Sequence, residues 1–106
     1  MKYLDNIEDL EYGNIILYVK DDACLDCINT NKYIAKIEEL HNNKWLFYEV
    51  NRSNIEIVKF YDIIGVPSFL AFKDGVVTAA FISKDSKSFL EIHEWIEKFT
   101  TKGDYI

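Results

Sequence analysis

Residues 15–19 (Ile-Ile-Leu-Tyr-Val) form a run of five apolar or aromatic residues without a charge. The run lies between Gly13-Asn14 and Asp21-Asp22, which are residues that break regular structure. An uninterrupted apolar run of this length is typical of a central β-strand that is buried on both faces. The run therefore predicts a sheet that is covered by helices on both sides.

Helical and strand patterns alternate along the rest of the chain, without an internal repeat, a low-complexity run or a linker. The N-terminal segment places Tyr3, Ile7 and Leu10 on one helical face, which predicts a helix. Asp74-Gly75 between two β-prone runs predicts an antiparallel hairpin. The expected elements are helices over 2–11, 24–41, 55–61 and 86–99, and strands over 15–19, 45–50, 68–72 and 76–82.

This order of elements predicts the fold class. Parallel strands joined by helices, followed by a hairpin and a covering helix, give a three-layer α/β/α sandwich around a mixed sheet of four to five strands. A length of 106 residues, 49% of them hydrophobic, is enough for one core and not for two. We therefore expect a single domain over residues 1–106.

The net charge of −6 disfavours binding to nucleic acid or to a membrane surface, because both are anionic. No apolar stretch approaches the roughly 18 residues that span a bilayer, and the N-terminus has neither a basic nor an apolar leader segment. These features predict a cytoplasmic protein. The two cysteines are too few for the disulfide framework of a small secreted domain.

Cys24 and Cys27 lie three positions apart, where the first strand is expected to pass into a helix. The unpaired N–H groups and the positive dipole at a helix N-terminus favour a thiolate, so Cys24 is expected to be the better nucleophile. Cys27, one turn later, is then placed to attack a mixed disulfide on Cys24 and release a reduced substrate. The pair predicts thiol–disulfide chemistry.

Two other interpretations of the cysteine pair stay open. Both residues can be small buried side chains without a chemical role. The other alternative is a zinc ion shared between two chains. Within one chain we expect no metal, because a zinc site needs about four ligands and His41 and His93 are isolated in the sequence. We expect His93 to be a partly buried, hydrogen-bonded residue, and Lys84, Asp85 and Lys87 to form a solvated turn.

Pro67 is the only proline, and it lies just before an expected strand. A proline there can simply form a turn. Together, however, the CxxC after the first strand, residues 61–69 (Tyr-Asp-Ile-Ile-Gly-Val-Pro-Ser-Phe) and residues 72–75 (Phe-Lys-Asp-Gly) resemble the thioredoxin-like proteins, in particular small bacterial members with a Cys-Pro-Asp-Cys centre. The resemblance covers nearly the whole chain. It implies that Pro67 is a cis-proline facing the CxxC and that the Val66 backbone pairs with an extended substrate peptide.

The chain departs from the thioredoxin pattern in three ways. Ala23 replaces the aromatic residue before the first cysteine, and Leu25-Asp26 replaces Gly-Pro between the cysteines. The third departure is Tyr18, which occupies the position of the buried Asp that accepts the proton of the resolving thiol. Glu49 on the next strand is the candidate proton relay in its place, with Tyr48 as the other candidate for the position beneath the CxxC. Glu49 can equally be a solvated residue at the strand end.

The predicted function is that of a thiol–disulfide oxidoreductase that reduces protein disulfides through Cys24 and Cys27. A reductase or a low-molecular-weight thiol would supply the electrons, and we expect no other cofactor. The alternative is a binding or adaptor module that keeps the fold and has little or no turnover. The loss of the aromatic residue, the Gly-Pro and the buried Asp motivates this alternative.

Overall fold

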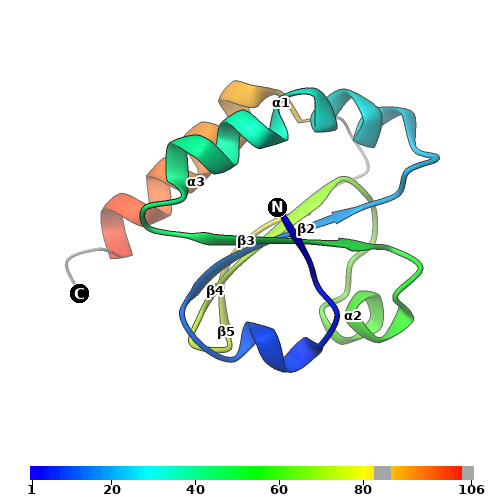
Figure 1. The fold of residues 1–106 in the computed structure, drawn as a ribbon, viewed down its shortest axis with the longest axis horizontal. Helices are drawn as coiled ribbons and strands as arrows, with labels where there is room; N and C mark the ends of the chain where they lie inside the picture. Colours follow the sequence, from blue (N-terminus) through cyan, green and yellow to red (C-terminus); the bar gives the residue numbers. More distant parts are fainter. Residues whose placement is uncertain (83–86, 104–106) are drawn as a thin grey trace.

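The structure is a computed structural model that describes residues 1–82 and 87–103, with the side chains of residues 101–103 left out. The elements alternate along the chain in nearly the order expected from the sequence (Figure 1). They are β1 (Lys2–Tyr3), the 3₁₀ helix η1 (Ile7–Leu10), β2 (Asn14–Lys20), α1 (Leu25–His41), β3 (Leu46–Asn51), α2 (Ile55–Phe60), β4 (Ser68–Lys73), β5 (Val76–Phe81) and α3 (Phe89–Gly103).

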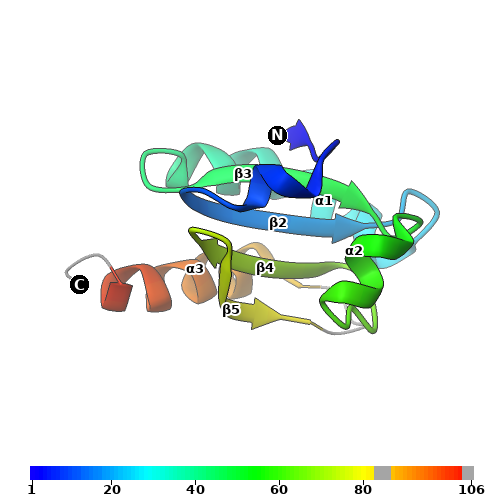
Figure 2. The same ribbon diagram turned by 90° about the horizontal axis from the view of Figure 1, so that it is seen from below.

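The five strands form one mixed sheet in the order β1-β3-β2-β4-β5, which Figure 2 shows from β3 to β5. β2 lies at the centre, parallel to β3 and antiparallel to β4. The hairpin of β4 and β5 turns at Asp74 and Gly75, which both have positive φ, at 48° and 86°. Two such residues in a two-residue loop match the right-handed twist of the strands, so the expected hairpin is confirmed.

Helices cover both faces of the sheet. α1 and α3 lie together on one face, and α2 and η1 lie on the other (Figure 1). Alternate residues of β2 supply the two cores: Leu17 points to the cluster that includes Ile57 of α2, and Ile16 to the cluster that includes Ile37 and Ile92 of α1 and α3. The expected three-layer α/β/α sandwich and the buried central strand are therefore confirmed.

The N-terminal segment differs from the prediction of a helix over residues 2–11. Lys2 and Tyr3 pair with β3, and only Ile7–Leu10 is helical, as a 3₁₀ turn. The Leu4 N–H donates to the Glu49 carbonyl oxygen at 2.8 Å, so the free edge of β3 satisfies the backbone of this segment. The spacing of Tyr3, Ile7 and Leu10 fits a helix, but the hydrogen bonds of the sheet edge outweigh it.

The last helix begins slightly later than expected and ends later. The Ser88 hydroxyl accepts the Glu91 N–H at 3.1 Å, and the Glu91 carboxylate accepts the Ser88 N–H at 3.0 Å. This reciprocal capping box fixes the start of α3 at Phe89. The expected start at residue 86 lies outside the described residues. None of the helices in the described part of the chain is long and apolar enough to cross a membrane.

Candidate functional site

Cys24 is the N-cap residue of α1. Its sulfur accepts a hydrogen bond from the Cys27 N–H at 3.2 Å, which is one of the backbone donors that a helix start leaves unpaired. The end of β2 and the turn formed by the Cys24 N–H with the Asp21 carbonyl oxygen bring the residue to this position. An N–H donor and the positive end of the helix dipole both stabilise negative charge on the sulfur.

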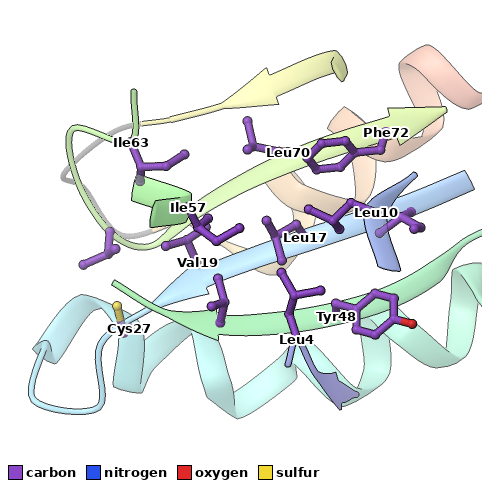
Figure 3. Close-up of a cluster of buried hydrophobic side chains, with 13 residues drawn as sticks. Leu4, Leu10, Leu17, Val19, Cys27, Tyr48, Ile57, Ile63, Leu70 and Phe72 are labelled. Carbon is purple, nitrogen blue, oxygen red and sulfur yellow. The ribbon is translucent and has the colours of Figure 1, made fainter. Parts of the chain in front are cut away.

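Cys27 has a different environment from Cys24. It is 0% exposed and belongs to the core cluster between the sheet and α2, where Figure 3 shows its sulfur at one end of the cluster. Burial and the neighbouring Cys24 thiol raise the pKa of Cys27, although the Asp21 N–H donates to its sulfur at 3.4 Å and opposes this shift. Cys24 is only partly buried, and both cysteines are free thiols. Cys24 is therefore the accessible thiol of the pair, and Cys27 is the buried thiol, which keeps its proton.

The loop before β4 faces the Cys24 thiol. Antiparallel pairing places Ser68, the first residue of β4, opposite Val19 near the end of β2. The preceding Val66–Pro67 peptide bond is cis, and the Cys24 sulfur lies 3.9 Å from the Val66 carbonyl oxygen. The sheet register thus brings the three predicted site residues Cys24, Val66 and Pro67 together.

The solvated turn was predicted over Lys84, Asp85 and Lys87, of which Lys84 and Asp85 lie outside the described residues. Lys87 also belongs to the region of the site, and for this residue the prediction is wrong. The residue is 1% exposed, and its ammonium group donates a hydrogen bond to the Pro67 carbonyl oxygen. The same group lies 5.1 Å from the centre of the Phe81 ring, and the Tyr33 hydroxyl donates to the Lys87 carbonyl oxygen. A charge run before a helix normally indicates solvent exposure, so no local signal distinguishes this lysine.

The acidic residues that surround the cysteines are neutralised in part by ion pairs. Asp21 lies 2.6 Å from the Arg52 guanidinium, and Asp22 lies 3.1 Å from the Lys20 ammonium. The Ala23 N–H, followed by Arg52, lowers the pKa of Asp21. Burial opposes the charge on Lys20, but its bonds to Asp22 and Glu49 outweigh burial and raise the pKa of this lysine. The site is thus less acidic than its sequence suggests.

Tyr48 and Glu49, the two candidates for the position beneath the thiols, lie on opposite faces of the sheet. Tyr48 belongs to the cluster that contains Cys27. Glu49 lies beside its register partner Tyr18 and forms an ion pair with Lys20 at 3.2 Å. Within the part of the chain that the structure describes, Glu49 makes no direct contact with the Cys27 sulfur.

Tyr18, at the position where the resemblance implies a buried Asp, lies under the first turns of α1. Its hydroxyl donates to the Asn31 side-chain oxygen at 2.7 Å and lies 3.5 Å from the Cys27 carbonyl oxygen. Burial, followed by the neighbouring Cys27 and Glu49, raises the pKa of this phenol. A neutral phenol that donates to Asn31 holds the helix against the sheet, and it is not a base at neutral pH.

Two large apolar side chains lie exposed next to the site. Leu25, directly after Cys24, is 77% exposed, and Ile64, two residues before Val66, is 74% exposed. Each of the two segments that meet at the Cys24 thiol therefore carries an exposed aliphatic residue, although Ala23 supplies no aromatic ring there.

Solved structures of other proteins confirm the fold that the sequence motifs implied. A structure of the thiol-resolving mechanism of a yeast mitochondrial 1-Cys peroxiredoxin, via glutathione and thioredoxin systems, contains a chain that matches with a TM-score of 0.78 and 13% identity, over 92% of this chain and 94% of that one. Thioredoxin from Trypanosoma brucei brucei matches with a TM-score of 0.76 and 14% identity, over 89% of this chain and 81% of its own. This chain therefore has the thioredoxin fold. No protein-family model matches it.

Proposed function

We propose that this protein is a thiol–disulfide oxidoreductase that reduces disulfides in protein substrates with the Cys24–Cys27 pair. The observation that carries the proposal is the position of the Cys24 sulfur. It caps α1, accepts the Cys27 N–H at 3.2 Å, and lies 3.9 Å from the Val66 carbonyl oxygen. A partly exposed sulfur at a helix N-terminus is the environment of a reactive cysteine, whereas structural cysteines are buried.

The reaction has two exchange steps. In the first, the Cys24 thiolate attacks one sulfur of a substrate disulfide, so that a mixed disulfide forms and the other substrate sulfur leaves as a thiolate. In the second, the Cys27 thiol loses its proton and attacks the Cys24 sulfur, which releases the second substrate thiolate. The substrate gains two electrons and the Cys24–Cys27 pair becomes a disulfide. A reductase or a low-molecular-weight thiol then returns two electrons to the pair.

Burial of Cys27 separates these two steps. Because its pKa is raised, Cys27 stays protonated at neutral pH and does not compete with Cys24 for the substrate. In the mixed disulfide it adjoins the sulfur that it must attack, since its own N–H already contacts Cys24. Intramolecular placement of this kind compensates for a low thiolate fraction.

The substrate is an extended peptide segment that lies along the Val66–Pro67 loop, which precedes β4. Leu25, the residue after Cys24, and Ile64, in the loop before β4, are both exposed, and they would provide apolar contacts for its side chains. A protein that must return to the dithiol state works in a reducing compartment, and we therefore place the reaction in the cytoplasm.

Glu49 is the carboxylate that we propose as the acceptor for the Cys27 proton, acting through solvent because its ion pair is with Lys20. A Glu49→Gln change should then slow the second step and leave the attack by Cys24 unchanged, while Glu49→Asp restores the rate in part. Asp22→Asn is the matched control, because it also removes a partner of Lys20. Release of substrate by Glu49→Gln at the normal rate would exclude this role.

Dithiothreitol-coupled reduction of insulin tests the proposed function. The reduced protein should accelerate the reaction, and a Cys24→Ser variant should show only the rate of dithiothreitol alone. A Cys27→Ser variant should accumulate covalent complexes with substrate proteins through Cys24. An adaptor module would instead bind partners equally well when both cysteines are replaced by Ser, and this result together with an inactive wild-type protein would overturn the proposal.

A further inference from the structure

A second cluster of reactive side chains lies where the end of α1 packs on α3. His41 is in the last turn of α1, and His93 and Glu97 are one turn apart on α3. The His41 Nε2 atom lies 3.0 Å from the His93 Nδ1 atom, and the His93 Nε2 atom lies 3.9 Å from a Glu97 carboxylate oxygen. One ligand atom from each residue lies within 4.8 Å of the others.

We propose that His41, His93 and Glu97 form a binding site for a divalent transition-metal ion of the zinc class. Two imidazoles and one carboxylate are the ligand set of many zinc sites with an open fourth position. Imidazole nitrogen is a good ligand for zinc and a poor one for Mg²⁺ or Ca²⁺, which prefer oxygen. We expected no metal site within one chain because the two histidines lie far apart in the sequence. In the fold, the contact of α1 with α3 brings them together.

The two imidazoles suit a metal ion with little movement, while the exposed Glu97 side chain must rotate to bring its carboxylate from within 4.8 Å to bonding distance. Zn–N bonds of about 2.0 to 2.1 Å at a tetrahedral angle place two nitrogens about 3.4 Å apart. The His41 and His93 nitrogens lie 3.0 Å apart as a hydrogen-bonded pair, so the rings need to separate by only about 0.4 Å. The ion then replaces the shared proton between the two rings, and that hydrogen moves to the other nitrogen of its ring.

The surroundings of the cluster also favour a cation. The C-terminal end of α1 carries the negative end of the helix dipole, and His41 lies in that last turn. Glu97 adds a negative charge, while Lys44 in the following turn is the cation that opposes binding. His41 is buried, His93 is partly exposed and Glu97 is exposed, so an ion can enter from the side of Glu97.

This site is separate from the thiols. α1 has 17 residues and is therefore about 25 Å long, with Cys24 before its first residue and His41 at its last. The cysteines, however, also bind zinc strongly. The experiment therefore uses a variant in which both cysteines are replaced.

The test is a calorimetric titration of Zn²⁺ into an untagged Cys24→Ser/Cys27→Ser variant. We expect saturable binding of one ion per chain, with a shift of the His41 and His93 imidazole ¹⁵N resonances. Mg²⁺ should give no binding. In this background, Glu97→Gln should weaken the affinity about 10-fold and His93→Gln by about 100-fold or more. Both residues retain solvent exposure, so these variants should fold.

Glu94→Gln is the matched control, because it removes the same charge from an exposed position of α3 that is not part of the group of His41, His93 and Glu97. It should bind Zn²⁺ as the parent does. The proposal is overturned if the parent shows no saturable binding, if His93→Gln or Glu97→Gln binds as tightly as the parent, or if Glu94→Gln loses as much affinity as Glu97→Gln.

Discussion

At its N-terminal end α1 presents the sulfur of Cys24, and 17 residues later its last turn presents the imidazole of His41 to His93 on α3. The first end has unpaired N–H donors and a positive partial charge, which suit an anionic sulfur. The second end has the negative partial charge, which suits a cation. One helix can therefore stabilise an anionic sulfur at one end and a cation at the other, because its two ends have opposite polarity.

The largest expected effect is at the thiol end. Cys24→Ser should lower the protein-catalysed part of insulin reduction by at least about 1,000-fold and leave only the rate of dithiothreitol alone, because the attacking sulfur is lost. Glu94→Gln on α3 should keep the full rate. If Cys24→Ser retained a tenth of the activity, the N-cap sulfur would not be the nucleophile.

At the histidine end, the expected effect is on stability. Zn²⁺ at 100 times its dissociation constant should raise the free energy of unfolding of the Cys24→Ser/Cys27→Ser variant by about 2.7 kcal/mol, since the ion binds only the folded chain. Urea unfolding with and without Zn²⁺ measures this difference. His93→Gln in the same background should show almost none of it at the same concentration, and an equal gain would contradict the assignment.

The buried thiol should make stability depend on pH. The pKa of Cys27 is raised in the folded protein above the unfolded value of about 8.5, so the folded state binds more protons between the two values. The free energy of unfolding of the reduced protein should therefore fall above about pH 8.5, by up to about 1.4 kcal/mol per pH unit.

Urea unfolding at pH 7 and pH 10, in the presence of a phosphine reductant, tests this dependence. The stability advantage of the wild type over Cys27→Ala should shrink by about 2 kcal/mol between the two pH values. If the stability difference between the wild type and Cys27→Ala were the same at both pH values, the Cys27 thiol would not be buried in its protonated form. This contribution is fully present below the unfolded pKa and is lost at higher pH.

The smallest expected effect is at Tyr18, which links β2 to the thiol half of α1. Tyr18→Phe keeps the stacking on Phe69, at 4.9 Å between ring centres, and removes the hydrogen bond to Asn31. We expect a loss of about 1 kcal/mol in the free energy of unfolding. Tyr12→Phe, at an exposed tyrosine, should change nothing. Equal effects of the two substitutions would remove this role from Tyr18.

The thiol end could be predicted from the sequence because its signals are local. The apolar run 15–19, the CxxC beside it and the Asp74-Gly75 turn each specify a short segment by themselves. The relation of Pro67 to Cys24 was inferred from a resemblance to a known family, because the sheet register that joins them involves residues far apart in sequence.

The histidine end could not be predicted because His41 and His93 are 52 residues apart, and only the packing of α1 on α3 joins them. The burial of Lys87 could not be predicted for the same reason, since its partners Pro67 and Phe81 belong to other segments of the chain. At the N-terminus, the helical spacing of Tyr3, Ile7 and Leu10 was too weak a signal to predict that the segment would pair with the open edge of β3. In each case a contact between distant segments determined the outcome.

The reduction potential of the Cys24–Cys27 pair tests the central claim most directly. Equilibration of the protein in dithiothreitol or glutathione buffers, followed by alkylation and mass spectrometry, gives the fraction of intramolecular disulfide at each potential. We predict a single two-electron transition at or below about −220 mV, which suits a reductase in a reducing compartment. A pair that forms no intramolecular disulfide, or a potential near −120 mV as in a strong oxidant, would contradict the account.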